Sequence, residues 1–124
     1  MPSHIHLVWE LLERNGNEMP NASFTKFTGH KFLEELRKNQ PRQLRRFGTN
    51  KDDRSHNFWI EKPLPKLIYT PEVIYQKLDY MHNNPCQGKW MLAPSPVEYE
   101  YSSAAFYDLG GKDFGFLSHI GERI

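Results

Sequence analysis

Apolar and polar side chains alternate along residues 4–11, which read His-Ile-His-Leu-Val-Trp-Glu-Leu. Alternate residues of a β-strand point to opposite faces, so this pattern predicts a strand. His4 and His6 share one face of that strand. The other face is entirely apolar and is expected to pack against a layer of helices; it comprises Ile5, Leu7, Trp9 and Leu11.

A first amphipathic helix is predicted over residues 23–38. Its apolar side chains recur three and four residues apart, whereas charged residues occupy the opposite side. Pro41 is expected to end it, because proline cannot continue a helical hydrogen-bond ladder. Residues 39–57 are polar, basic and without a period, so they are predicted to form a loop.

The second helix has the best-defined ends in the chain. Thr70 is a good N-cap, Pro71 suits the first helical position, and Pro85 should stop the helix near residue 83. Three shorter elements are expected: extended segments at residues 58–61 and 67–69, and a helix at residues 102–107. Together these elements predict one domain of the α+β class over residues 1–124, with an antiparallel sheet that carries the histidines and packs against two main helices.

Composition narrows the class of protein. The chain has 124 residues, of which 38% are hydrophobic, 14% aromatic and 25% charged, as expected for a globular domain with one modest core. The beginning of the sequence lacks the pattern of a signal peptide, and no apolar run has the roughly 20 residues that span a bilayer. Cys86 is the single cysteine, which excludes an internal disulfide. These features predict an intracellular, cytoplasmic protein without a membrane partner.

The net charge of +1 says little, but its distribution is uneven. Residues 37–51 contain six basic side chains and no acidic one, including Arg42, Arg45 and Arg46. Such a block could neutralise several phosphates of a nucleic acid. From charge alone, a solvated loop is the commoner explanation.

His4 and His6 raise the question of a metal site. Two imidazoles on one face of a strand are close enough to share a divalent cation and would leave coordination positions open for a substrate. By itself the pair is a weak motif, since most such pairs are incidental surface histidines.

Tyr80 and Asn84 lie one turn apart on the second helix, at the edge of its apolar stripe. A tyrosine in this position is commonly a packing residue whose hydroxyl reaches water. The alternative is a phenol presented beside an amide that binds a metal through its carbonyl oxygen. A tyrosine needs a cation or a base nearby to act as a nucleophile at neutral pH.

Four motifs, taken in order, resemble those of the single-tyrosine HUH transposases, and most nearly the REP-associated tyrosine transposases. They are MPSHIHLV at residues 1–8, FTKFT at residues 24–28, KLDYMHNNP at residues 77–85 and YEYSSA at residues 99–104. The set covers nearly the whole chain. Each motif is weak alone, whereas the ordered set is specific.

The resemblance implies a ferredoxin-like antiparallel sheet with helices on one face. It also implies metal-dependent cleavage and rejoining of single-stranded DNA in a bacterial mobile element. Tyr80 matches the nucleophile, which would form a 5′-phosphotyrosine. His4, His6 and Asn84 match the ligands of Mg²⁺ or Mn²⁺. Many relatives have the longer glutamine at the third position, and Asn84 precedes a proline, which disfavours helical geometry, so Asn83 is a second choice. Arg42, Arg45, Arg46 and Lys77 are expected to contact single-stranded or hairpin DNA.

The family has a strand and a helix before its His-x-His strand, and no counterpart precedes residue 4 here. The resemblance therefore implies an N-terminally incomplete sheet with an unpaired edge, which a homodimer could fill. Two alternatives to a transposase stay open. One is a remnant that binds structured DNA without cutting it, and the other is a small metal-dependent hydrolase in which Tyr80 only packs.

Overall fold

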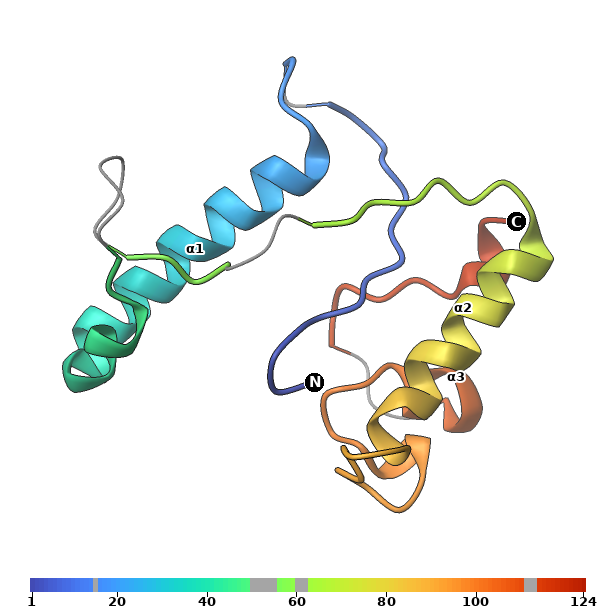
Figure 1. Ribbon diagram of the computed structural model, residues 1–124. Helices are drawn as coiled ribbons and strands as arrows, with labels where there is room; N and C mark the ends of the chain where they lie inside the picture. The colour runs from blue at the N-terminus through green and yellow to red at the C-terminus, as the bar shows by residue number, and fades with distance from the viewer. Residues whose placement is uncertain (15, 50–55, 60–62, 111–113) are drawn as a thin grey trace. The chain divides into compact units, whose positions relative to one another are not determined.

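The structure is a computed structural model that describes residues 1–14, 16–49, 56–59, 63–110 and 114–124 (Figure 1). The chain divides into two compact units. The first, here called the histidine unit, combines residues 1–9 with residues 67–124. The second, the arginine unit, is residues 10–66.

The arginine unit is built on helix α1, Pro20–Asn39. It begins three residues before the predicted start, because Pro20 occupies the first turn, where a missing N–H costs nothing. The N–H groups of Ala22 and Ser23 both donate to the Met19 carbonyl, at 2.9 and 3.0 Å. The sequence pattern located the body of this helix but missed Pro20 as its start.

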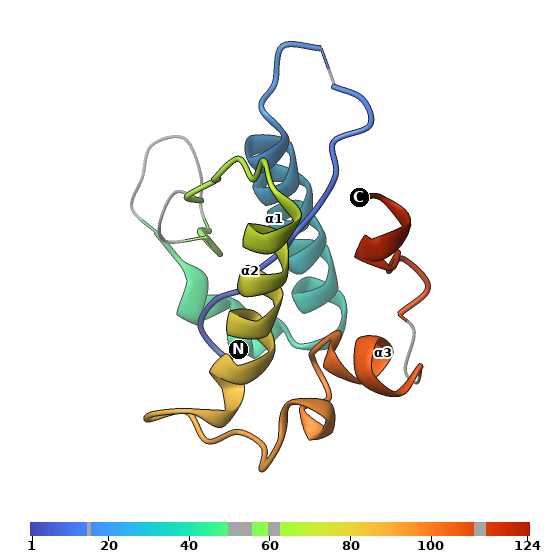
Figure 2. The same ribbon diagram turned by 90° about the vertical axis from the view of Figure 1, so that its right-hand side faces the viewer.

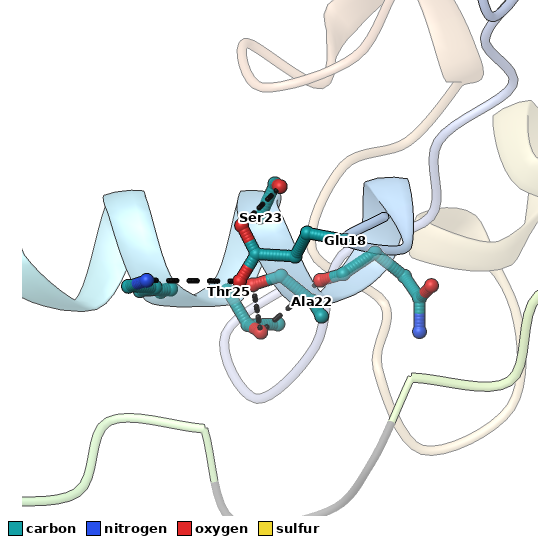
Figure 3. A network of polar contacts seen from close by, with 6 residues as sticks. Glu18, Ala22, Ser23 and Thr25 are labelled. Atoms are coloured by element: carbon teal, nitrogen blue, oxygen red, sulfur yellow. Dashed lines mark hydrogen bonds and ion pairs between the residues drawn. The ribbon is translucent and has the colours of Figure 1, made fainter. Parts of the chain in front are cut away.

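A polar network fixes the first turns of α1 (Figure 3). The Ser23 hydroxyl donates to Glu18 at 2.7 Å, and Lys26 lies 3.7 Å from the same carboxylate. Glu18 thereby holds a negative charge near the positive end of the helix, which stabilises it. The Thr25 hydroxyl donates to the carbonyl oxygens of Asn21 and Ala22, each at 3.1 Å.

Aromatic side chains join α1 to the rest of its unit. The Trp59 Nε1 donates to the Thr28 hydroxyl at 2.9 Å, and the Phe32 ring lies 5.8 Å from Phe58. The Phe47 and Phe58 rings are 4.8 Å apart. Phe47 ends the 3₁₀ helix η1, Pro41–Phe47, in a region predicted to be a loop. The sequence pattern did not predict η1, because a short 3₁₀ helix can form without the periodic apolar stripe that marks an amphipathic helix.

In the histidine unit, helix α2 spans Pro71–Asn83, which confirms the predicted helix. The Thr70 hydroxyl accepts from the Val73 N–H at 3.4 Å, as expected of an N-cap. A short 3₁₀ helix, η2, continues the chain over Asn84–Cys86. The first residues of the chain, in dark blue, run close to α2 (Figures 1 and 2).

Three further short helices complete this unit: η3 (Pro96–Glu98), α3 (Ala104–Leu109) and η4 (Ile120–Glu122). Four apolar side chains are buried among the described residues of both units, and all four belong to the histidine unit: Leu78, Pro85, Ala93 and Ala104. His82 of α2 is buried with them and lies 2.9 Å from the Ser103 hydroxyl. The core therefore lies between α2 and the start of α3.

The expected fold class is wrong. The structure is about half helical, and its described residues contain no sheet, only an isolated antiparallel bridge between Gly48 and His56. Residues 4–11 are not a strand, and their apolar side chains Ile5, Leu7, Trp9 and Leu11 are 46–52% exposed. A strand needs a hydrogen-bonded neighbour, which a side-chain pattern cannot supply.

In the segments expected to provide that neighbour, the described residues form no strand. Residues 67–69 are irregular, as are Phe58 and Trp59, and the remainder of the predicted strand at 58–61 lies outside the described residues. Pro63 and Pro65 have no N–H to donate, which limits pairing between the two segments. None of the helices in the described ranges combines the length and the apolar character needed to cross a membrane.

Candidate functional site

The structure brings together the four residues to which the sequence assigned chemistry. The His4 and His6 rings are 4.9 Å apart and nearly perpendicular, at 81°. The His6 ring lies 5.7 Å from the Tyr80 ring, and its Nε2 lies 3.4 Å from the Asn84 side-chain nitrogen. Residues more than 70 positions apart in the sequence thus meet in the histidine unit.

Asn84 keeps the helical register in spite of the proline that follows it. Its φ and ψ are −54° and −41°, and its N–H donates to the Tyr80 carbonyl. The bias against helical geometry before proline is therefore overcome, because η2 continues directly from α2. As a result, the Asn84 side chain lies one turn beyond Tyr80 and reaches His6.

The separation of the His6 and Asn84 side chains fits two ligands of a shared divalent cation. Two atoms that each lie about 2.0–2.2 Å from one ion are roughly 2.8–3.6 Å apart at the angles of tetrahedral or octahedral sites. The 3.4 Å between His6 Nε2 and the Asn84 amide falls in this range. A half-turn of the amide would place its oxygen, the ligating atom, where the nitrogen now lies.

Neighbouring groups favour the form of histidine that binds metals. The Ser3 hydroxyl lies 3.1 Å from His4 Nδ1, so the other ring nitrogen, Nε2, remains available to bind a metal. Burial lowers the pKa of His6, and the charges of His4 and of the chain's N-terminus lower it further. A lowered pKa keeps His6 neutral, as ligation requires.

Tyr80 is accessible to a substrate, since 57% of it is exposed while its ring lies against His6. Tyr75 of the same helix lies in a different part of the unit, near Gly121. If Gly121 carried a Cβ, that atom would lie 3.7 Å from the Tyr75 hydroxyl. Lys77, expected to contact DNA, is exposed on α2. The two tyrosines of α2 therefore have distinct surroundings.

Asn83, the second choice of ligand, has another partner. Its side-chain nitrogen donates to the Asp79 carbonyl at 2.8 Å, so the amide is held against α2. Between the two asparagines, the geometry thus favours Asn84.

Within the described part of the chain, no group of three or more histidine, cysteine, aspartate and glutamate side chains could hold a metal. An ion here would depend on the amide oxygen as its third protein ligand.

The remaining predicted site residues belong to the arginine unit. Arg42, Arg45 and Arg46 are exposed on η1, the last two in its final turn. The prediction of a loop missed that a 3₁₀ helix presents them. Their position on a short helix gives them a defined local spacing, and their exposure leaves them accessible to phosphates.

Sequence reasoning missed two features of the histidine unit. The Trp90 ring lies 5.8 Å from that of His4, and Lys89 lies over the indole, 5.0 Å from its centroid. His82, which lies in the KLDYMHNNP segment, contacts Ser103 and lies 5.6 Å from the Tyr107 ring. The Gly-Lys-Trp triplet at residues 88–90 was the available signal for the first feature, since exposed aromatic and basic neighbours are common where nucleic acids bind.

The comparisons with protein-family models, curated proteins and solved structures gave no match.

Proposed function

We propose that this chain is a metal-dependent DNA strand transferase that acts through a tyrosine nucleophile, in the manner of single-tyrosine HUH transposases. The observation that carries the proposal is the meeting of His4, His6, Tyr80 and Asn84 in one place. The ordered motifs that resemble that family add support. The exposed arginines of η1 are consistent with a nucleic-acid substrate.

The residues divide the chemistry between binding and attack. His4, His6 and Asn84 would hold Mg²⁺ or Mn²⁺, which would draw charge from an oxygen of the scissile phosphate. Tyr80 attacks the phosphorus, and its proton passes to solvent, to which the side chain is open. The P–O3′ bond breaks, the 3′ oxygen takes up a proton, and the 5′ end stays on Tyr80 as a phosphotyrosine.

Rejoining reverses these steps. A 3′-hydroxyl attacks the phosphotyrosine, a new phosphodiester forms and the Tyr80 hydroxyl is regenerated. One phosphodiester replaces another, so the sequence of steps needs no nucleoside triphosphate. Because His6 and Tyr80 of the same chain are ring neighbours, the proposal needs no second copy of the chain at the site.

The test is formation of a covalent adduct on hairpin and single-stranded oligonucleotides labelled at the 5′ or 3′ side, with Mn²⁺ present. A denaturing gel should show protein linked to the 5′ phosphate of the cleaved product. Tyr80→Phe should abolish the adduct, and Tyr75→Phe, a matched change on the same helix, should leave it. Metal-dependent cleavage that persists in Tyr80→Phe would instead identify a hydrolase, whereas DNA binding without any cleavage would identify a non-catalytic binding protein.

A mixing experiment tests whether the site works within one chain. His6→Ala and Tyr80→Phe are each expected to be inactive alone. If Tyr80 acts beside the histidines of its own chain, a mixture of the two variants should also be inactive. Recovery of the adduct in the mixture would overturn this part of the proposal and show a site shared between two copies.

A further inference from the structure

The loop that follows η2 has a defined shape. The Leu92 N–H donates to the Pro85 carbonyl at 2.8 Å, and the Trp90 N–H donates to the Gln87 carbonyl at 3.2 Å. Gly88 supports the turn with a φ of 57°, which glycine adopts without strain. The loop is thus closed by backbone hydrogen bonds, and it presents Lys89 and Trp90 together.

Met91 marks this loop as strained. Its φ of 39° lies in the left-handed region, where non-glycine residues are uncommon, and its side chain is exposed. Apolar packing of Met91 does not account for the conformation. Strained backbone of this kind concentrates at functional sites, where it orients a neighbouring group. The group immediately before Met91 is the Trp90 indole.

Trp90 extends the row of rings that forms the candidate site. It is half-buried, with its ring 5.8 Å from His4 at an angle of 63°. The row then continues through His6 to Tyr80. On Trp90 the flexible, exposed Lys89 side chain places its ammonium 5.0 Å from the ring centroid. An aromatic surface and a cation therefore adjoin the predicted metal ligands.

We propose that Trp90 and Lys89 form a nucleotide-binding subsite beside the reacting phosphate. The base of a neighbouring nucleotide stacks on the indole, and Lys89 leaves the ring to pair with a backbone phosphate. Stacking on an aromatic ring beside a basic side chain is how proteins hold single-stranded DNA without reading its sequence. The subsite rests on the proposed function, because it places a nucleotide next to the phosphate that Tyr80 attacks.

A simpler role for Trp90 would be to hold the His4 ring in place. The two roles differ in what they require of the DNA. A stacking residue interacts with bases, so its effect disappears when the oligonucleotide lacks them. A residue that only orients His4 affects the affinity for metal. It does not change how much more tightly the protein binds DNA with bases than DNA without them.

The experiment compares binding of oligothymidylate of about ten nucleotides with binding of an abasic oligomer of the same length and charge. It is performed without metal, by fluorescence anisotropy of labelled DNA. The unmodified protein should prefer the oligomer with bases. Trp90→Ala should reduce that preference by roughly 5- to 150-fold, the range for one stacked base, and Trp90→Phe should retain part of it. Trp9→Ala, which removes a different and more exposed indole of the histidine unit, is the control and should leave the preference unchanged.

A second measurement keeps the test decisive if Trp90→Ala does not fold. In a Trp9→Phe, Trp59→Phe protein, Trp90 is the remaining tryptophan, and oligothymidylate should quench its fluorescence while the abasic oligomer should not. Equal binding of both oligomers, or quenching by neither, would overturn the subsite. Reduced Mn²⁺ affinity in Trp90→Phe with an unchanged base preference would overturn it too and assign Trp90 to positioning His4.

These readouts are independent of the proposed reaction. A base preference that depends on Trp90 establishes the subsite even if no adduct forms on Tyr80. An adduct that forms with no base preference sustains the proposed function and removes the subsite.

Discussion

The two units of the chain differ in how tightly their side chains are packed. The histidine unit contains all the side chains that are buried among the described residues, with Leu78 and Ala104 at 6% and 0% exposure. Among the described residues of the arginine unit none is buried, and aromatic rings that are half-buried or exposed gather around Trp59. Close packing thus coincides with the unit that holds the candidate catalytic residues.

The difference follows from what each proposed role demands. Metal ligation and in-line attack need groups held within a fraction of an ångström, which a packed core and specific hydrogen bonds provide. Phosphate attraction acts over several ångströms and tolerates mobile side chains. A unit that presents arginines can therefore work with looser packing than a unit that must fix two imidazoles, an amide and a phenol.

Removing one predicted ligand should have the largest effect, and only in the histidine unit. We expect His6→Ala to abolish adduct formation and to weaken Mn²⁺ binding by more than about 100-fold, since even outer partners of metal ligands contribute 10- to 100-fold. Titration calorimetry measures the affinity. His30→Ala, on exposed α1, is the matched control and should bind Mn²⁺ as the unmodified protein does. Equal Mn²⁺ affinity in the two variants would refute the metal site.

The next largest effect should fall on the arginine unit. Changing Arg42, Arg45 and Arg46 together to alanine should remove about three phosphate contacts and lower the slope of log affinity against log salt by roughly two to three units. Anisotropy titrations at several salt concentrations measure this slope. A triple variant with the same change in charge at Arg14, Lys26 and Lys31 serves as control. If both variants lower the slope equally, the effect is one of net charge and η1 is not a DNA contact.

The sequence predicted the helices better than the fold. The ends of α2 were readable because Thr70, Pro71 and Pro85 act locally. The expected sheet failed because alternation at residues 4–11 describes one segment, whereas a sheet depends on a partner elsewhere in the chain. The ring contacts of Trp90 and Phe58 were equally out of reach, since they join residues distant in sequence.

The candidate site was predictable to a greater extent than the fold around it. The one-turn spacing of Tyr80 and Asn84 follows from helix geometry alone. The meeting of His6 with both of them was implied by the family resemblance and not by any local pattern. The choice between Asn83 and Asn84 needed the structure, because it depends on which amide is already bonded to the helix backbone.

The unequal packing of the two units can be tested directly. Ala104→Val should destabilise the histidine unit by about 1–3 kcal/mol, because a fully buried alanine leaves no space for two more methyl groups. Ala22→Val, at an exposed position of α1, should cost less than about 1 kcal/mol. Hydrogen exchange resolved by segment measures both. We expect faster exchange in α2 and α3 for the first variant and little change for the second; similar, small effects in both would mean that the histidine unit has no tighter core.

The smallest expected effect concerns His82 and pH. Burial lowers the pKa of His82, and the nearby carboxylates of Asp108 and Asp79 offset this only in part. Between this lowered pKa and the usual value near 6.5, the unfolded chain binds a proton that the folded chain does not, so stability should fall as the pH falls below about 6.5. The loss should level off once the folded protein is also protonated.

Urea unfolding with a chelator present, at pH values from neutral to mildly acidic, measures how the stability depends on pH. His82→Gln also removes ring contacts, so its overall stability should be lower, but its slope with pH should be shallower by up to one proton. His30→Gln, an exposed change on α1, should keep the slope of the unmodified protein. An unchanged slope in His82→Gln would show that His82 titrates alike in the folded and unfolded chains, and that its contact with Ser103 adds nothing to the pH dependence of the core between α2 and α3.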